Sequence, residues 1–427
     1  MAAIDASQYD EIIIESGDGQ RTVDMRLGIL AIRYFEDLFS PTITVEITVT
    51  NTGGVVKGKD GTLQSLYSGL PLRGGERVFI KIAGNSKTNK GIDLKDQPLY
   101  VSKISNVIRE GQRESFVLKL VSRESIANET TRLSGKYGSS QISDHVAKIV
   151  KESLLSDKPV SSDDASNQYS FIGNLKRPFD VITMLASKSI PDTGVPGYFF
   201  YETIDGYNFR SIDKLIVEGK SKVKAEYFHQ EDQNYEKSTD NRILSYSVSR
   251  NNDLLEKLRL GTYASFFAQY DPYLSRFTTV QEGKRTINDF AKKATFLGDD
   301  PEVPQLFGSG NFEFDTIPSR IVTSVLDVGV LEKGVSYNTG NDAKNYQRDA
   351  MFRYNYLFMQ TLTMTVPLNT TLQAGNVIKC NFLKISSNSK EFDRENSGLY
   401  MIKELCHHFD GKQSLTSMKL LRDTFGD

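Results

Sequence analysis

The two ends of this sequence echo each other at a separation of 300 positions. On each side a glycine opens a run rich in β-branched residues, a Leu-Tyr pair follows, and a second glycine precedes a closing Lys-Leu pair. Each match alone is weak, because glycine in turns and leucine in strands are common. Together they predict either a duplicated β-domain or two antiparallel meanders that look alike by coincidence. The repeated positions are Gly75 and Gly375, Leu99 and Leu399, Tyr100 and Tyr400, Gly111 and Gly411, and Leu120 and Leu420.

The echo lies within segments that carry the pattern of strands. Residues 42–49 alternate almost strictly between apolar and polar side chains, which places Val45, Ile47 and Val49 on one face. Residues 110–112, with glycine at their centre, separate two apolar runs in the manner of a hairpin turn. We therefore expect strands at 42–49, 77–82, 99–104 and 115–121 near one end, and at 360–366, 376–380, 399–403 and 415–421 near the other.

The middle of the chain has a different character. A serine pair at 139–140 can cap a helix whose apolar residues recur at helical spacing over 142–154. Pro178 suits the first turn of a second helix, and Asp205 with Gly206 predicts a hairpin turn. Further along we expect strands at 243–248 and 261–267, a helix at 287–293 and a loop at 298–310.

These segments predict a mainly β fold with α/β inserts, in which two similar β-domains are accompanied by smaller inserted domains. The 427 residues leave room for several domains. We assign residues 1–125 together with 201–250 to the first β-domain, 126–200 to an inserted α/β domain, 251–305 to a connecting domain, and 306–427 to the second β-domain.

The charge of the chain is balanced overall and at both ends. There are 52 basic and 54 acidic residues; residues 1–125 carry 16 of each, and 306–427 carry 13 of each. Neither end has the excess of Lys and Arg that phosphate binding requires. No apolar run approaches the length of a membrane span, and the first residues do not resemble a signal peptide. Two cysteines, Cys380 and Cys406, cannot build a disulfide framework, so we expect a reduced, soluble protein.

Two segments come close to known ligand-binding motifs without completing them. Residues 53–60 nearly spell a P-loop, but Asp60 replaces the Ser or Thr that binds Mg²⁺, and no capped helix follows. Cys406, His407 and His408 suggest a metal site. Neighbouring residues on a strand point to opposite faces, however, so the two histidines cannot face one site with regular geometry.

Carboxylates gather in two further segments, at 391–395 and at 163–164. Neither has the glycine and bidentate glutamate that a calcium loop needs. Their spacing does not exclude a glycosidase pair, although nothing singles out one carboxylate as the acid. No nucleophile elbow, zinc-protease helix or dinucleotide fingerprint occurs in the sequence. We expect no catalytic, cofactor-binding or metal-binding residues.

The order of the pieces resembles that of the baseplate central hub proteins of contractile-tailed, T-even-like phages. Residues 397–402, leading through 407–409 to 415–423, look like the closing hairpin of that family. Residues 260–264, followed by 270–272, look like its middle segment. The resemblance implies that the two β-domains are tail-tube-like β-barrels, and that the chain is a structural protein and not an enzyme.

The resemblance also implies an assembly. Three copies would form a homotrimeric ring of six similar barrels, joining the six-fold tail tube above to the three-fold spike protein below, with wedge proteins around it. DNA would pass through the channel without specific binding, and the chain would not insert into a membrane. The implied location is the virion, in the tail baseplate, after synthesis in the host cytoplasm. Two alternatives stay open: an equivalent hub or spike-base component of a contractile injection or secretion system, and a tail-associated glycosidase.

Overall fold

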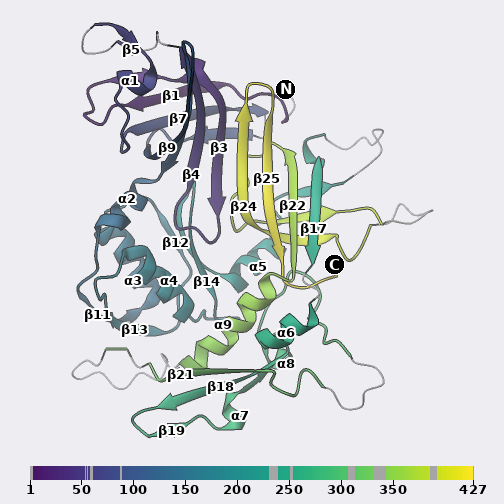
Figure 1. The fold of residues 1–427 in the computed structure, drawn as a ribbon. Coiled ribbons are helices and arrows are strands. Elements are labelled where there is room, and N and C mark those ends of the chain that lie inside the picture. The colour runs from purple at the N-terminus through teal and green to yellow at the C-terminus, as the bar shows by residue number, and fades with distance from the viewer. Residues whose placement is uncertain are drawn as a thin grey trace.

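The computed structural model of the protein describes residues 3–52, 54, 56–57, 61–86, 89–229, 239–250, 253–305, 313–327, 329–330, 343–384 and 392–426. Long antiparallel strands from both ends of the chain lie side by side in an upper layer (Figure 1). An α/β unit and a smaller sheet with its helices lie below this layer. The main sheet therefore unites segments that are hundreds of residues apart in the sequence.

One half of the main sheet, which we call the first meander, comes from the first 121 residues. Its strands are β3 (Ile29–Asp37), β4 (Thr44–Thr52), β10 (Arg113–Val121), β9 (Leu99–Glu110) and β7 (Arg77–Ser86), in that spatial order, with β1 (Tyr9–Glu15), β2 (Thr22–Asp24) and β8 (Asn89–Asp93) at its outer edge. Val45, Ile47 and Val49 are buried on one face of β4, which confirms the alternation seen in the sequence. The expected hairpin around Gly111 is also confirmed.

The other half, the second meander, is formed mainly by the last 70 residues. Its strands are β17 (Ser245–Arg250), β22 (Gln360–Pro367), β25 (Ser414–Arg422), β24 (Gly398–Asp410) and β23 (Val377–Asn381), and β16 (Glu226–Phe228) adds to β23 in parallel. This spatial order matches that of the first meander strand for strand, with β17 in the place of β3 and β24 in the place of β9.

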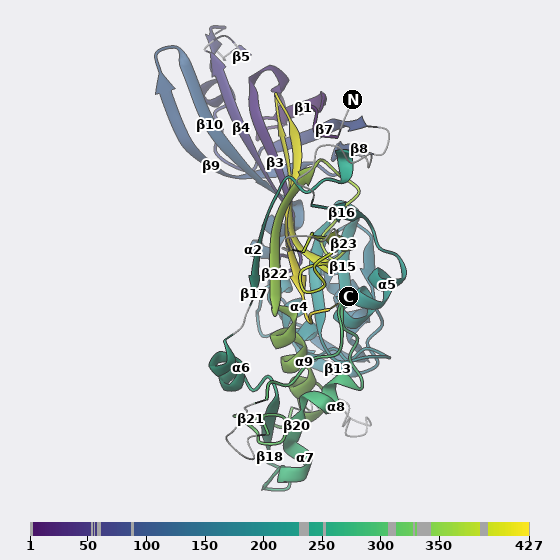
Figure 2. The same cartoon turned by 90° about the vertical axis from the view of Figure 1, so that its right-hand side faces the viewer.

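The two meanders are joined edge to edge. β3 pairs antiparallel with residues 404–410 of β24, so both meanders belong to one sheet, and one hydrophobic core runs beneath it. The expected barrels take the form of this open sheet, because no pairing among the described residues closes either meander into a barrel. The hairpin of β9 and β10 projects at the far side of the first meander (Figure 2).

An α/β unit follows the first meander. Its elements are α2 (Arg123–Thr130), β11 (Lys136–Gln141), α3 (Ile142–Lys148), a short π-helix (Ile149–Ser153), β12 (Val160–Ser162), β13 (Gln168–Ile172), α4 (Pro178–Lys188), β14 (Tyr198–Thr203), β15 (Gly206–Ser211) and α5 (Ile212–Ser221). The helix beginning at Pro178 and the hairpin at Asp205 and Gly206 are confirmed. The pairing corrects one boundary: β15 pairs with β12, while β16 and β17 pair in the second meander, so 201–250 does not return to the first β-domain.

A third unit lies at the end farthest from the meanders (Figure 1). It contains α6 (Leu254–Leu260), β18 (Ala264–Asp271), β19 (Arg276–Phe277), α7 (Val280–Gly283), β20 (Lys284–Thr286), α8 (Ile287–Ala291), β21 (Arg320–Val325) and α9 (Ala343–Leu357). β21 pairs in parallel with β18, and α9 packs against α4 and α8. After residue 306, the strands of the second meander therefore begin only at β22, because β21 belongs to this third unit. The expected loop at 298–310 is described only as far as 305.

A buried ion pair ties this third unit to the rest of the chain. The guanidinium of Arg353 on α9 is fully buried and lies 3.0 Å from the Asp423 carboxylate, just after β25. It also contacts the carboxylate of Asp213 on α5. Because a buried cation is stable only when it is paired, this contact fixes α9 under the end of the second meander.

Candidate assembly interface

The repeated glycines Gly75 and Gly375 form matching corners. Both have a positive φ, 89° and 84°, which glycine adopts without strain. The Gly75 N–H donates to the carbonyl of Val101 at 2.7 Å, and the Gly375 N–H donates to the carbonyl of Ile402 at 2.8 Å. The corner that opens β7 and the corner that precedes β23 are therefore built in the same way.

A β-bulge is also repeated. In the first meander, Lys119 pairs with Lys103 and Leu120 pairs with Val101, so Ser102 is an extra residue between them. In the second meander Lys403 is the extra residue opposite the corresponding positions 419 and 420. A bulge bends and twists a strand locally, so the two meanders curve at the same place. Leu120 and Leu420 are both fully buried beside it.

The pairing shifts part of the echo by one residue. Leu99 faces Val78 across its strand pair, whereas Ile378, which corresponds to Val78, faces Tyr400. Leu99 and Tyr400 are both buried, while Leu399 is half-buried. Residues in this part of β9 and β24 therefore correspond at a separation of 301 and not 300, and Tyr100 takes the place of the residue after Tyr400.

The separation returns to 300 at the hairpin tips. Gly111 and Gly411 lie in two-residue turns at the ends of the β9–β10 and β24–β25 hairpins. The reason is a second bulge that only β9 has, where Asn106 adopts a positive φ of 53°. This extra residue cancels the one-residue difference before the turn is reached.

The junction between the meanders is built around an aromatic stack. Tyr34 of β3 lies over the imidazole of His407 on β24, with ring centroids 5.9 Å apart. His407 is buried, and its Nδ1 lies 3.0 Å from the hydroxyl of Thr416. Burial lowers the pKa of His407 to about 4, so the ring is neutral and packs as part of the sheet.

A buried carboxylate completes this junction. Glu36 accepts hydrogen bonds from the Tyr34 hydroxyl at 2.7 Å, from the Ile204 N–H at 3.0 Å and from the Ala374 N–H at 2.8 Å. Burial raises its pKa to about 7 despite these donors. Glu36 therefore joins the first meander, the α/β unit and the second meander. No sequence pattern marks Glu36 as a functional residue, because an acidic residue at an inward position interrupts the alternation along β3.

The structure separates the residues of the near-motifs. His407 is buried in the junction, whereas His408 is partly exposed and lies 3.3 Å from Asp410. Asp163 pairs with Arg210 at 3.0 Å. Part of the P-loop-like segment and residue 391 lie outside the described residues. In the part of the chain that is described, no cluster of His, Cys, Asp and Glu has the geometry to hold a metal ion, and no helix is long and apolar enough to cross a membrane.

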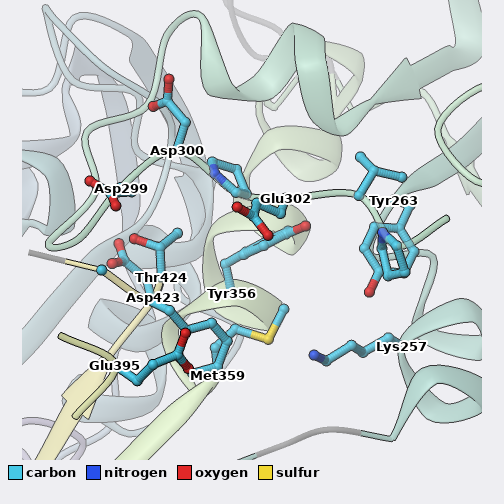
Figure 3. A pocket seen from close by; sticks show the side chains of 15 residues that line it. Lys257, Tyr263, Asp299, Asp300, Glu302, Tyr356, Met359, Glu395, Asp423 and Thr424 are labelled. Atoms are coloured by element: carbon cyan, nitrogen blue, oxygen red, sulfur yellow. The ribbon is translucent and has the colours of Figure 1, made fainter. Parts of the chain in front are cut away.

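A pocket of about 440 Å³ lies below the second meander, between the third unit and the C-terminal residues. Figure 3 shows the carboxylates of Asp299 and Asp300 on one side of it and the ammonium of Lys257 on the other. The Tyr356 hydroxyl is buried in its wall and has no hydrogen-bond partner among the described residues. The groups in its lining that can exchange a proton are carboxylates, the Lys257 ammonium and the hydroxyls of Tyr263 and Tyr356.

Two solved structures of tail proteins share this fold along nearly their whole length. The 43 kDa tail protein of prophage MuSo2 from Shewanella oneidensis aligns with a TM-score of 0.54 and 11% identity, over 97% of this chain and 98% of its own. A tail protein from Neisseria meningitidis MC58 aligns with a TM-score of 0.55 and 10% identity, over 97% of both chains. The chain thus has the fold of phage tail proteins along nearly its whole length.

This likeness lies in the fold and not in the sequence. No protein-family model matches the chain, and no curated protein matches its sequence. The features of the chain that bear on its function are therefore the geometry of the two meanders and of the junction between them.

Proposed function

We propose that this chain is the structural hub of a phage tail baseplate, and that three copies form a ring. The observation that carries the proposal is the repetition within one chain of strand order, glycine corner and bulge. Three copies of a chain with two similar meanders present six similar units around a three-fold axis. Such a ring can contact a six-fold tube on one side and a three-fold spike on the other.

The tail-protein fold supports the baseplate part of this proposal. The balanced charge of both ends of the chain suits a ring through which DNA passes without specific binding. In this role the tail tube lies above the ring, the spike protein below it and the wedge proteins around it. The chain acts through shape and sheet contacts, and it carries out no catalysis.

The test is the native mass of the purified chain, alone and with its spike partner. One copy has a mass of 47.9 kDa, so a trimer has three times that mass, about 144 kDa. We expect the trimer at least in the presence of the spike. A protein that remains monomeric under both conditions contradicts the hub role, and lysis of cell-wall material by the chain alone in a zymogram contradicts the absence of catalysis.

A further inference from the structure

The junction inside the chain provides a template for a junction between chains. β3, the first strand of the first meander, pairs with the outer edge of β24, the fourth strand of the second meander. The outer edge of β24 pairs with two different strands: residues 398–401 pair with β23, and residues 404–410 pair with β3. By strand order, β17 occupies the place of β3, and β9 occupies the place of β24. The edges that correspond to the two sides of this junction are therefore those of β17 and β9.

Both of these corresponding edges are open. Among the described residues, β17 pairs only with β22. β9 pairs with β10 along its length, but with β7 only at Leu99 and Tyr100, and Val101 bonds to the backbone of Gly75 and Glu76. No strand among the described residues lies beside the outer edge of 102–110. An open strand edge exposes N–H and C=O groups that can pair with another chain. Six strands separate the two edges along the strand path, and no pairing among the described residues joins them within one copy.

Apolar side chains gather at the open edges. Val107 and Ile108 of β9 are 43% and 57% exposed, and Leu244 and Tyr246 at β17 are 41% and 42% exposed. The corresponding stretch of β24, where β3 lies beside it, is buried at alternate positions. A second strand at these edges would shield the same kinds of side chain from water.

The pairing also fixes which residues of β3 and β17 correspond. Phe35 aligns with Val121 through the one strand between them, β4. Ser249 aligns with Leu421 through β22 in the same way. Because Val121 and Leu421 occupy equivalent places in their meanders, Ser249 takes the place of Phe35.

The same comparison applies to β9 and β24. Ser105 faces Val117 across the first hairpin, and Cys406 faces Ser417 across the second. Val117 and Ser417 are equivalent, so Ser105 takes the place of Cys406. Ser105 precedes the bulge at Asn106, and β24 has no bulge at the corresponding place, so the extra residue does not affect this correspondence.

We propose that β17 of one copy pairs antiparallel with the outer edge of β9 of a second copy, with Ser249 facing Ser105. This register copies the internal one, in which Phe35 faces Cys406. The inference rests on the proposed function, since it assumes that copies of the chain meet in a ring. It goes beyond that function by naming the two strands and their alignment, which makes the main sheet continuous from copy to copy.

The test is disulfide cross-linking of the full-length double variant Ser105→Cys/Ser249→Cys. Residues directly opposite each other in an antiparallel pair have Cα atoms about 4.5–5.5 Å apart, which a disulfide can span. We expect oxidation to give a covalent trimer that reductant returns to monomer. The matched control is Ser105→Cys/Ser247→Cys: it places the second thiol two residues away on the same face, about 8 Å from its target, and should cross-link at least tenfold less.

Single variants complete the design. A mixture of Ser105→Cys and Ser249→Cys chains should give covalent dimers, whereas each single variant alone should give none, because Cys380 is buried and Cys406 lies inside the junction. A trimeric native mass without preferential cross-linking of the Ser105/Ser249 pair overturns the strand pairing and leaves the hub role intact. A monomeric native mass for wild type and variants, with and without the spike, overturns both.

Discussion

The two meanders share their strand order but differ in what lies beside their fourth strand. β24 has β3 along its outer edge, and its inward side chains are buried to the hairpin tip. β9 has no such neighbour within the described part of the chain, and most of its residues beyond Val101 are exposed. The strands occupy equivalent positions, so the difference comes from the neighbour and not from the scaffold. The edge of β24 is thus covered by a strand of the same chain, whereas the equivalent edge of β9 lacks a neighbouring strand.

The largest expected effect compares Leu405 with Ile104, which occupy equivalent positions on β24 and β9. Leu405 is 1% exposed, whereas Ile104 is only partly buried. Leu405→Ala should lower the free energy of unfolding of the isolated chain by about 3 kcal/mol, because it leaves a cavity in a packed core. Ile104→Ala should lower it by about 1 kcal/mol. Urea unfolding of both variants as monomers measures these losses. Equal losses of unfolding free energy would show that the two positions are equally well packed, against this prediction.

The next effect concerns Glu36, whose place in the second meander is taken by the partly exposed Arg250. The pKa of Glu36 is raised to about 7 in the folded chain, above its ordinary value of 4.5, because the carboxyl is buried. Between these values the folded state holds more protons than the unfolded state, so stability falls as pH rises through this window.

Glu36→Gln removes this titration. Relative to the variant, the wild type should lose on the order of 2 kcal/mol between pH 4.5 and pH 7.5. Urea titrations of both proteins across this range give the difference, which cancels the titration of other groups such as His407. Parallel stability curves for the two proteins would show that the Glu36 carboxyl is not held protonated by the junction.

The smallest effect compares the two glycine corners. Alanine at position 75 would meet nothing within 4 Å, whereas alanine at position 375 would place its Cβ 2.5 Å from the hydroxyl of buried Tyr201. Both substitutions strain a positive φ, at a cost of about 1 kcal/mol. Gly375→Ala should therefore be less stable than Gly75→Ala by about a further 1 kcal/mol. Thermal unfolding measures the difference, and Tyr201→Phe in the Gly375→Ala background should restore part of it.

Local signals in the sequence predicted much of the fold. Pro178 marks the start of α4, and Asp205 with Gly206 marks the β14–β15 hairpin, because the preferences of these residues act over a few neighbours. Apart from β3 and the strands at the outer edges, the strands of both meanders follow from their apolar pattern and from the glycines between them.

The remaining features depend on contacts between distant residues. β3 escaped prediction because Glu36 is stable inside only through donors such as Ala374, 338 positions away. The extra residue at the Asn106 bulge, which β24 lacks, displaces Tyr400 from the register of the echo, and no residue type signals it. The domain boundary after residue 200 failed for a similar reason, since the parallel pairing of β16 with β23 links segments about 150 residues apart.

The central claim is that both meanders occupy equivalent places in one ring, and electron microscopy of the purified assembly tests it most directly. Because three copies carry two meanders each, end-on averages should show six similar densities around a central opening in the meander layer. The layer of α/β units should show three-fold symmetry only. A ring in which the meander layer has only three densities, or particles with no ring at all, would contradict the claim.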